Sequence, residues 1–155
     1  ARQNHEHSLS SMSRMMTYPG MTAIKPDHLI KMCARASNLG LPEGNYCLGH
    51  AHQYGSEVEK SLDKALFFYR KAAQKGHLEA QIALALLLYE QKEHEGSLVE
   101  AYAWALMVQN NIDSEDKDEL RNRVENLLGL LRTEMGDDEL QAAKEKAAQL
   151  KEARQ

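Results

Sequence analysis

The sequence has 155 residues, a formal net charge of −4 and only two cysteines. A chain of this length forms one ordinary domain, and its acidic balance argues against a nucleic-acid ligand, which requires a basic surface. No apolar run approaches the roughly 20 residues that span a bilayer, and two cysteines are too few for a disulfide scaffold.

Residues 1–24 differ from the rest of the chain and are predicted to form a flexible N-terminal tail. They are rich in Ser and Met, and Tyr18, Pro19 and Gly20 form a turn signal. They do not resemble a signal peptide, because no charged start precedes an apolar block. Since the first residue is not Met, we expect a chain that was processed, trimmed or cut from a longer one, with any signal peptide already removed. Cytoplasm and periplasm both stay open as its compartment.

From residue 26 onward the sequence predicts about seven helices and no sheet, because Ala, Leu, Glu and Lys dominate and no alternating strand pattern occurs. Pro42 suits a first helical turn, Ser61 an N-cap and Gly55 a helix end. Ser97 and Glu100 form a capping-box pattern. The helices are expected to begin near residues 27, 42, 61, 78, 97, 113 and 137.

A shift of 36 residues aligns the sequence with itself without a gap. The matched pairs are Leu48 and Leu84, Ser61 and Ser97, Leu62 and Leu98, Ala65 and Ala101, Phe68 and Trp104, and Ala72 and Val108. Each unit is a helical hairpin that cannot bury its apolar face alone, so hairpins must stack. We expect close helix approach at Gly49, with Phe68 filling the space between the helices. The aromatic residues of the second helices are predicted to be core: Phe67, Phe68, Tyr69, Tyr102 and Trp104.

The first repeat resembles the Sel-one-like repeat, a tetratricopeptide-related unit of about 36 residues. The matching residues are Leu48-Gly49, Gly55, Val58, Lys64-Ala65, the run Phe68-Tyr69-Arg70-Lys71-Ala72-Ala73, Gly76 and Glu79-Ala80. The second repeat departs from the pattern, since Ala85, Gln91 and Ile112 stand where glycine is expected.

The resemblance implies an all-α fold, a short right-handed superhelix of stacked antiparallel helical hairpins. We expect one domain over residues 25–155, with a half unit at 27–43, repeats at 44–79 and 80–115, and C-terminal capping helices within 113–155. Members of the family generally act as adaptors or scaffolds for other proteins, in the cytoplasm or the bacterial envelope, and generally lack catalytic residues.

The resemblance also implies a concave groove lined by the first helix of each hairpin. The residues expected to face it are Tyr46, His50, Gln53 and Tyr54 from the first repeat and Ile82, Leu86, Tyr89 and Glu90 from the second. Tyrosine offers apolar area together with one hydrogen bond, which suits peptide contact. The predicted partner is therefore another protein or a peptide. No cofactor is expected, and self-association stays open.

Cys33 and Cys47 flank a predicted turn, so antiparallel pairing brings them to similar heights on neighbouring helices. A disulfide needs Cα atoms within about 7 Å, which adjacent helices only just reach, and an oxidising compartment. The two residues are therefore either bonded or simply small and buried. Cys47 and His50 have the spacing of a nucleophile and base, but they lack an orienting third group and an oxyanion site.

No metal site and no catalytic residue is predicted. His50 and His52 lie two residues apart on one helix and point in different directions, so they do not converge on an ion. The main hypothesis is a non-enzymatic adaptor or scaffold that binds a partner through the concave face. The alternative is a structural component of a bacterial envelope complex, held by its edges and its C-terminal helix.

Overall fold

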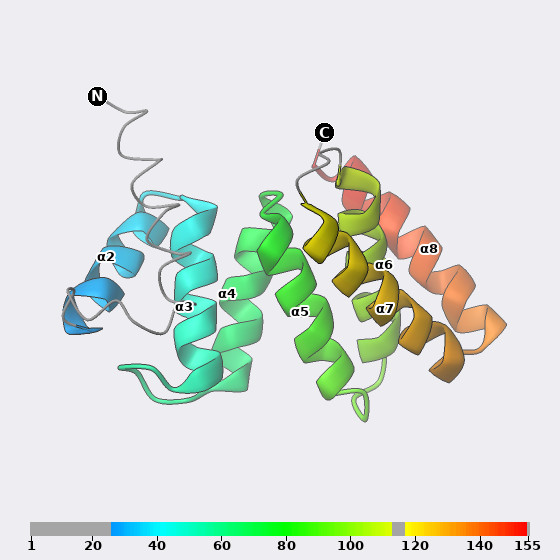
Figure 1. Ribbon diagram of the computed structural model, residues 1–155, viewed down its shortest axis with the longest axis horizontal. Coiled ribbons are helices and arrows are strands. Elements are labelled where there is room, and N and C mark those ends of the chain that lie inside the picture. Colours follow the sequence, from blue (N-terminus) through cyan, green and yellow to red (C-terminus); the bar gives the residue numbers. More distant parts are fainter. Residues whose placement is uncertain (1–25, 113–116, 155) are drawn as a thin grey trace. The chain divides into compact units, whose positions relative to one another are not determined.

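The computed structural model describes residues 26–112 and 117–154, which form seven helices and no strand (Figure 1). The helices are α2 (Pro26–Asn38), α3 (Pro42–Tyr54), α4 (Leu62–Gln74), α5 (Leu78–Glu90), α6 (Ser97–Asn111), α7 (Asp118–Glu134) and α8 (Asp137–Glu152). The predicted all-α class is confirmed. The predicted tail at 1–24 and the expected helix start near residue 113 lie outside the described residues.

The chain divides into two compact units, Ala1–His77 and Leu78–Gln155, here called unit 1 and unit 2. In unit 1, α3 packs against both α2 and α4. In unit 2, α6 packs against α5, α7 and α8. None of the helices in the described part of the chain is long and apolar enough to cross a membrane.

The helix ends of unit 1 follow the local signals in the sequence. Pro42 occupies the first turn of α3, and Gly55 ends that helix with a left-handed φ of 71°. The Ser61 Oγ accepts a hydrogen bond of 3.3 Å from the backbone N–H of Lys64, as an N-cap does. These three predictions are confirmed.

The close approach of α3 and α4 occurs at Gly49, as expected, but a different aromatic residue fills the space. A Cβ at Gly49 would lie 2.6 Å from Cδ1 of Tyr69, so only glycine lets that ring pass. Phe68, predicted to fill this position, instead packs on a cluster of Cys33, Cys47 and Leu48. The prediction was wrong by one residue because a one-residue shift along α4 moves a side chain by about 100° around the helix.

A disulfide joins Cys33 of α2 to Cys47 of α3, with their Cα atoms 5.8 Å apart. Both residues are buried in the apolar cluster that also contains Leu48. The bond therefore fixes α2 to α3 at the point where the two helices share their core.

Unit 2 is built around α6, whose Ala101, Trp104 and Val108 side chains are buried. The helix does not begin with the predicted capping box. Its N-cap is Gly96, at a left-handed φ of 78°, and Ser97 is buried without capping the helix. Glu100 instead accepts a hydrogen bond of 3.3 Å from the Trp104 indole N–H. The predicted capping box is wrong, because the helix begins one residue earlier than predicted and the Glu100 N–H bonds to the backbone carbonyl of Gly96.

Candidate partner-binding surface

Four of the predicted contact residues form one strip along α3, here called the α3 stripe: Tyr46, His50, Gln53 and Tyr54. They are spaced at i, i+4, i+7 and i+8, which places them on one side of a helix. Tyr54 is 62% exposed, whereas the other three are half-buried. The stripe is therefore partly anchored in unit 1 and open to solvent at one end.

Tyr46 is held by two other rings of unit 1. Its ring stacks on His77, with centroids 4.8 Å apart and an angle of 22° between the planes. Its centroid also lies 5.8 Å from that of Tyr69, the ring that packs on Gly49. These contacts fix the orientation of Tyr46 before any ligand arrives.

Gln53 is oriented by the same buried tyrosine. The Tyr69 hydroxyl donates a hydrogen bond of 2.7 Å to the Gln53 Oε1. Burial raises the pKa of Tyr69, and its neighbours Tyr46 and Tyr54 raise it further. The phenol therefore stays protonated and remains a donor. The bond directs the amide nitrogen of Gln53 away from Tyr69.

His50 makes the stripe an uncharged surface near neutral pH. Its ring centroid lies 4.5 Å from that of Tyr54, and burial lowers its pKa. The buried Nδ1 has no hydrogen-bond partner among the described residues. A neutral imidazole between two tyrosines gives the stripe aromatic area and hydrogen-bonding groups but no net charge.

The four residues predicted from α5 do not behave alike. Ile82 is only 1% exposed, so it does not present a surface to a ligand, and that part of the expectation is corrected. Leu86 and Tyr89 are half-buried and Glu90 is exposed. The cause is the composition of α5, which is apolar almost all round and is buried on several sides.

Tyr89 already has a partner within unit 2. Its hydroxyl donates a 2.7 Å hydrogen bond to Oε1 of Glu134, at the end of α7, and Lys92 pairs with Oε2 of the same carboxylate at 2.7 Å. These two hydrogen bonds lower the pKa of Glu134, while the bond to Glu134 raises the pKa of Tyr89. Glu134 was not predictable from the sequence, because it lies 45 residues from Tyr89 and no spacing pattern links them.

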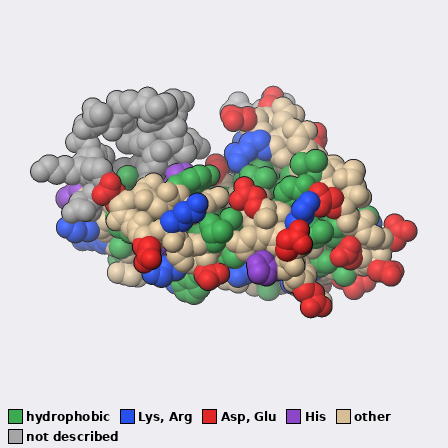
Figure 2. All heavy atoms as spheres, turned by 90° about the horizontal axis from the view of Figure 1, so that it is seen from below, with side chains coloured by type: hydrophobic (Ala, Val, Ile, Leu, Met, Phe, Trp, Pro, Cys, Tyr) green, Lys and Arg blue, Asp and Glu red, His purple; other side chains and the backbone are tan. Residues whose placement is uncertain are grey.

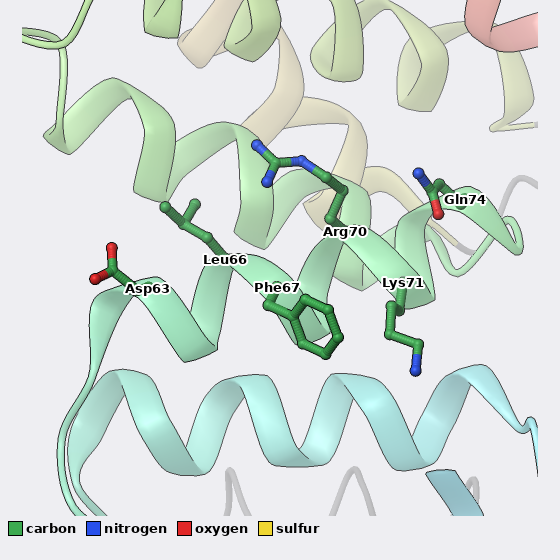
Figure 3. Close-up of a pocket in the computed structure, with 6 residues that line it drawn as sticks. All are labelled: Asp63, Leu66, Phe67, Arg70, Lys71 and Gln74. Carbon is green, nitrogen blue, oxygen red and sulfur yellow. The ribbon is translucent and has the colours of Figure 1, made fainter. Parts of the chain in front are cut away.

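A second surface lies on α4, where sequence analysis placed only core aromatics. Phe67 is 55% exposed, which corrects its assignment to the core. It lines a depression of about 330 Å³ together with Asp63, Leu66, Arg70, Lys71 and Gln74, all on α4. Figure 3 shows Leu66 and Arg70 projecting from one side of the helix, and Phe67 and Lys71 from the other. The Lys71 Nζ lies 5.3 Å from the Phe67 ring centroid.

The arrangement of helices matches a known fold. The chain aligns with the crystal structure of a protective antigen present in uropathogenic Escherichia coli strains, described as displaying an SLR (Sel-one-like repeat) fold. The TM-score is 0.78 and the identity 20%, and the alignment covers 99% of this chain and 31% of that one. The chain has an SLR fold. The aligned part is about a third of that protein's length. At 20% identity, the similarity establishes the fold alone. No family model and no curated protein matches the sequence.

The SLR fold typically mediates protein–protein interaction and is generally non-catalytic. Cys47 is bonded to Cys33 and so offers no thiol nucleophile in this state. Among the residues that the structure describes, no three His, Cys, Asp or Glu side chains are grouped to hold a metal ion. The surfaces on α3 and α4 offer aromatic area and hydrogen-bonding groups, and the α4 surface also holds Arg70 and Lys71.

Proposed function

We propose that the chain is a non-enzymatic adaptor or scaffold that binds a peptide segment of a partner protein along the α3 stripe. The observation that carries the proposal is the ordered set of rings on α3, with Tyr46 held by His77 and Tyr69 and with His50 packed on Tyr54. Side chains that are already ordered in the free protein lose little conformational entropy on binding. Less of the favourable free energy of their contacts is then offset by ordering, which raises affinity.

The chemistry of the stripe favours an uncharged, partly apolar segment. Tyrosine and histidine rings supply apolar area, and the Tyr54 hydroxyl and the Gln53 amide supply hydrogen bonds to a peptide backbone. No carboxylate or ammonium belongs to the stripe itself. An extended segment with one or two apolar or aromatic side chains therefore fits it better than a strongly charged one.

Leu86 and Glu90 remain accessible on α5 and are proposed as partner-contact residues of unit 2 in their own right. A substitution of Tyr89 is a poor test of partner binding, because the Tyr89 hydroxyl donates a hydrogen bond to Glu134. Replacing it would disturb the contact between α5 and the end of α7 as well as any bound partner. Leu86→Ser and Glu90→Lys test the contribution of α5 without breaking that hydrogen bond.

The proposal is tested by affinity capture from host cells, read by quantitative mass spectrometry. Wild type is compared with Tyr54→Ser and Tyr46→Ala, and with Phe67→Ser as a matched change of an exposed aromatic on α4. A partner that is retained by wild type and Phe67→Ser but lost by both tyrosine variants supports the α3 stripe. A partner retained equally by all four proteins places the contact elsewhere and refutes the proposal.

A second candidate function is structural, as a component of a bacterial envelope complex. The Cys33–Cys47 disulfide favours it, because disulfides persist in oxidising compartments such as the periplasm. In this case the outer face of α8 is proposed to make the contact. Deleting α8 is a poor test, since Ala143 and Ala147 are buried and α8 packs on α6. Arginine at the exposed Ala142 and Ala148 blocks that face while keeping the helix, and should abolish assembly only if this second function holds.

A further inference from the structure

The two units carry formal net charges of opposite sign, although the net charge of the whole chain is −4. Residues 1–77 hold ten Lys and Arg against six Asp and Glu, a formal charge of +4. Residues 78–155 hold nine against 17, a formal charge of −8. Within unit 2, Figure 2 shows many Asp and Glu side chains where α7 and α8 lie. Each unit is thus electrostatically complementary to the other unit of a second copy.

Unit 1 combines this positive charge with exposed apolar side chains, in a surface here called the α4 face: Leu39, Phe67, Lys71 and Lys75. Phe67, Lys71 and Lys75 follow one another at four-residue spacing on and just beyond α4. The Lys75 ammonium group donates to the backbone carbonyl of Gly40, so this end of α4 lies beside the α2–α3 turn. Leu39, in that turn, is 68% exposed. The α4 face therefore combines two exposed apolar residues, Leu39 and Phe67, with two Lys residues.

Unit 2 has an exposed apolar side chain with a bare helix surface beside it, here called the α7 face: Gly129 and Leu130. Leu130 is 50% exposed in the C-terminal half of α7. A Cβ at Gly129 would meet no atom within 4 Å, so nothing described within the chain requires glycine there. Glycine inside a helix lowers the stability of that helix. Glycine is nevertheless common at positions where another group must approach the backbone closely.

We propose that the α4 face of one copy docks on the α7 face of a second copy, in a head-to-tail contact. Phe67 would cover the open surface at Gly129 and pack against Leu130, while Lys71 and Lys75 would face the acidic surface of unit 2. Two different surfaces make this contact heterologous, so it joins copies in a chain or ring rather than in a two-fold dimer. The proposal is independent of peptide binding to the α3 stripe.

The test uses full-length chains in sedimentation velocity over a series of protein concentrations, at low and high salt. Wild type is expected to associate as its concentration rises, and less so at high salt, because opposite charges attract across the contact. Phe67→Ser, which damages the α4 face, and Gly129→Gln, which blocks the α7 face, should each associate at least roughly tenfold more weakly. Both changes are at exposed positions, and circular dichroism verifies that each variant is folded.

Mixing the two variants gives the decisive result. The intact α7 face of Phe67→Ser can still bind the intact α4 face of Gly129→Gln, so the mixture should form a one-to-one dimer and nothing larger. Lys71→Glu should behave like Phe67→Ser, and Tyr54→Ser, a change of an exposed aromatic on α3, should associate like wild type. The proposal is overturned if wild type is monomeric at every concentration, if either single variant associates like wild type, or if the mixture forms no dimer.

Discussion

Gly49→Ala is expected to destabilise unit 1, because the Tyr69 ring of α4 packs directly on Gly49 of α3. The added Cβ would lie 2.6 Å from Cδ1, 2.7 Å from Cε1 and 3.0 Å from Cγ of Tyr69. The ring is buried and cannot turn away freely, so the helices must separate or the ring must leave its place. Overpacking of this kind costs about 1–3 kcal/mol.

Alanine also favours the helix over glycine by about 0.5–1 kcal/mol, which offsets part of that cost. The net loss of stability is therefore about 1–2 kcal/mol. The change also reaches the candidate site, because Tyr69 donates to Gln53 and contacts the ring of Tyr46. Partner binding along the α3 stripe should also weaken, because a displaced Tyr69 no longer orients Gln53 and Tyr46.

The matched control is the same substitution at Gly129, where no described atom lies within 4 Å of the added Cβ. Gly129→Ala should stabilise unit 2 by about 0.5–1 kcal/mol through helix propensity alone. Urea unfolding followed by circular dichroism measures both variants. The fluorescence of Trp104, the chain's one tryptophan, reports unit 2. A Gly49→Ala protein as stable as wild type would refute the packing argument.

Three further predictions concern the disulfide, His50 and Tyr89. Replacing both Cys33 and Cys47 by Ser should lower stability by about 3 kcal/mol, since the bond closes a loop with a sequence separation of 14, and urea unfolding in air and under reductant checks this. Burial lowers the pKa of His50 below 6.5, so the unfolded chain binds more protons and stability should fall as pH drops below about 6.5. His50→Phe should reduce that loss, and equal pH dependence in both proteins would contradict it. Tyr89→Phe removes a hydrogen bond to the ionised carboxylate, so NMR titration should show a higher pKa for Glu134, and an unchanged value would exclude the contact in solution.

The ends of α3 and the start of α4 were predictable from the sequence, because helix ends depend on residues that are close in sequence. Pro42, Gly55 and Ser61 act within one turn of their own position, and each marks the end or start of a helix in the structure. The capping box at Ser97 was not formed, because the N-cap is Gly96 and Ser97 is buried inside the helix start. Local chemistry alone could not reveal that burial.

The site was predictable only where it follows from position on one helix. Tyr46, His50, Gln53 and Tyr54 share a side of α3 by spacing alone. Their supports were not predictable, because Tyr69 and His77 reach the stripe through tertiary packing. The burial of Ile82 and the exposure of Phe67 depend in the same way on which sides of α5 and α4 are covered. On α5, which is apolar nearly all round, a hydropathy pattern does not distinguish the covered sides from the open ones. On α4, Phe67 and Phe68 are adjacent aromatic residues, and the sequence alone does not show which of them faces solvent.

Photo-crosslinking from position 54 tests the role of the α3 stripe most directly. Tyr54 is replaced by photoreactive p-benzoylphenylalanine in host cells, and the exposed Gln149 on α8 is replaced in the same way as the control. The account predicts a covalent adduct with one partner protein from position 54, absent from position 149 and reduced by Tyr46→Ala. Equal adducts from both positions, or none from position 54, would contradict the assignment of the α3 stripe as the partner-binding surface.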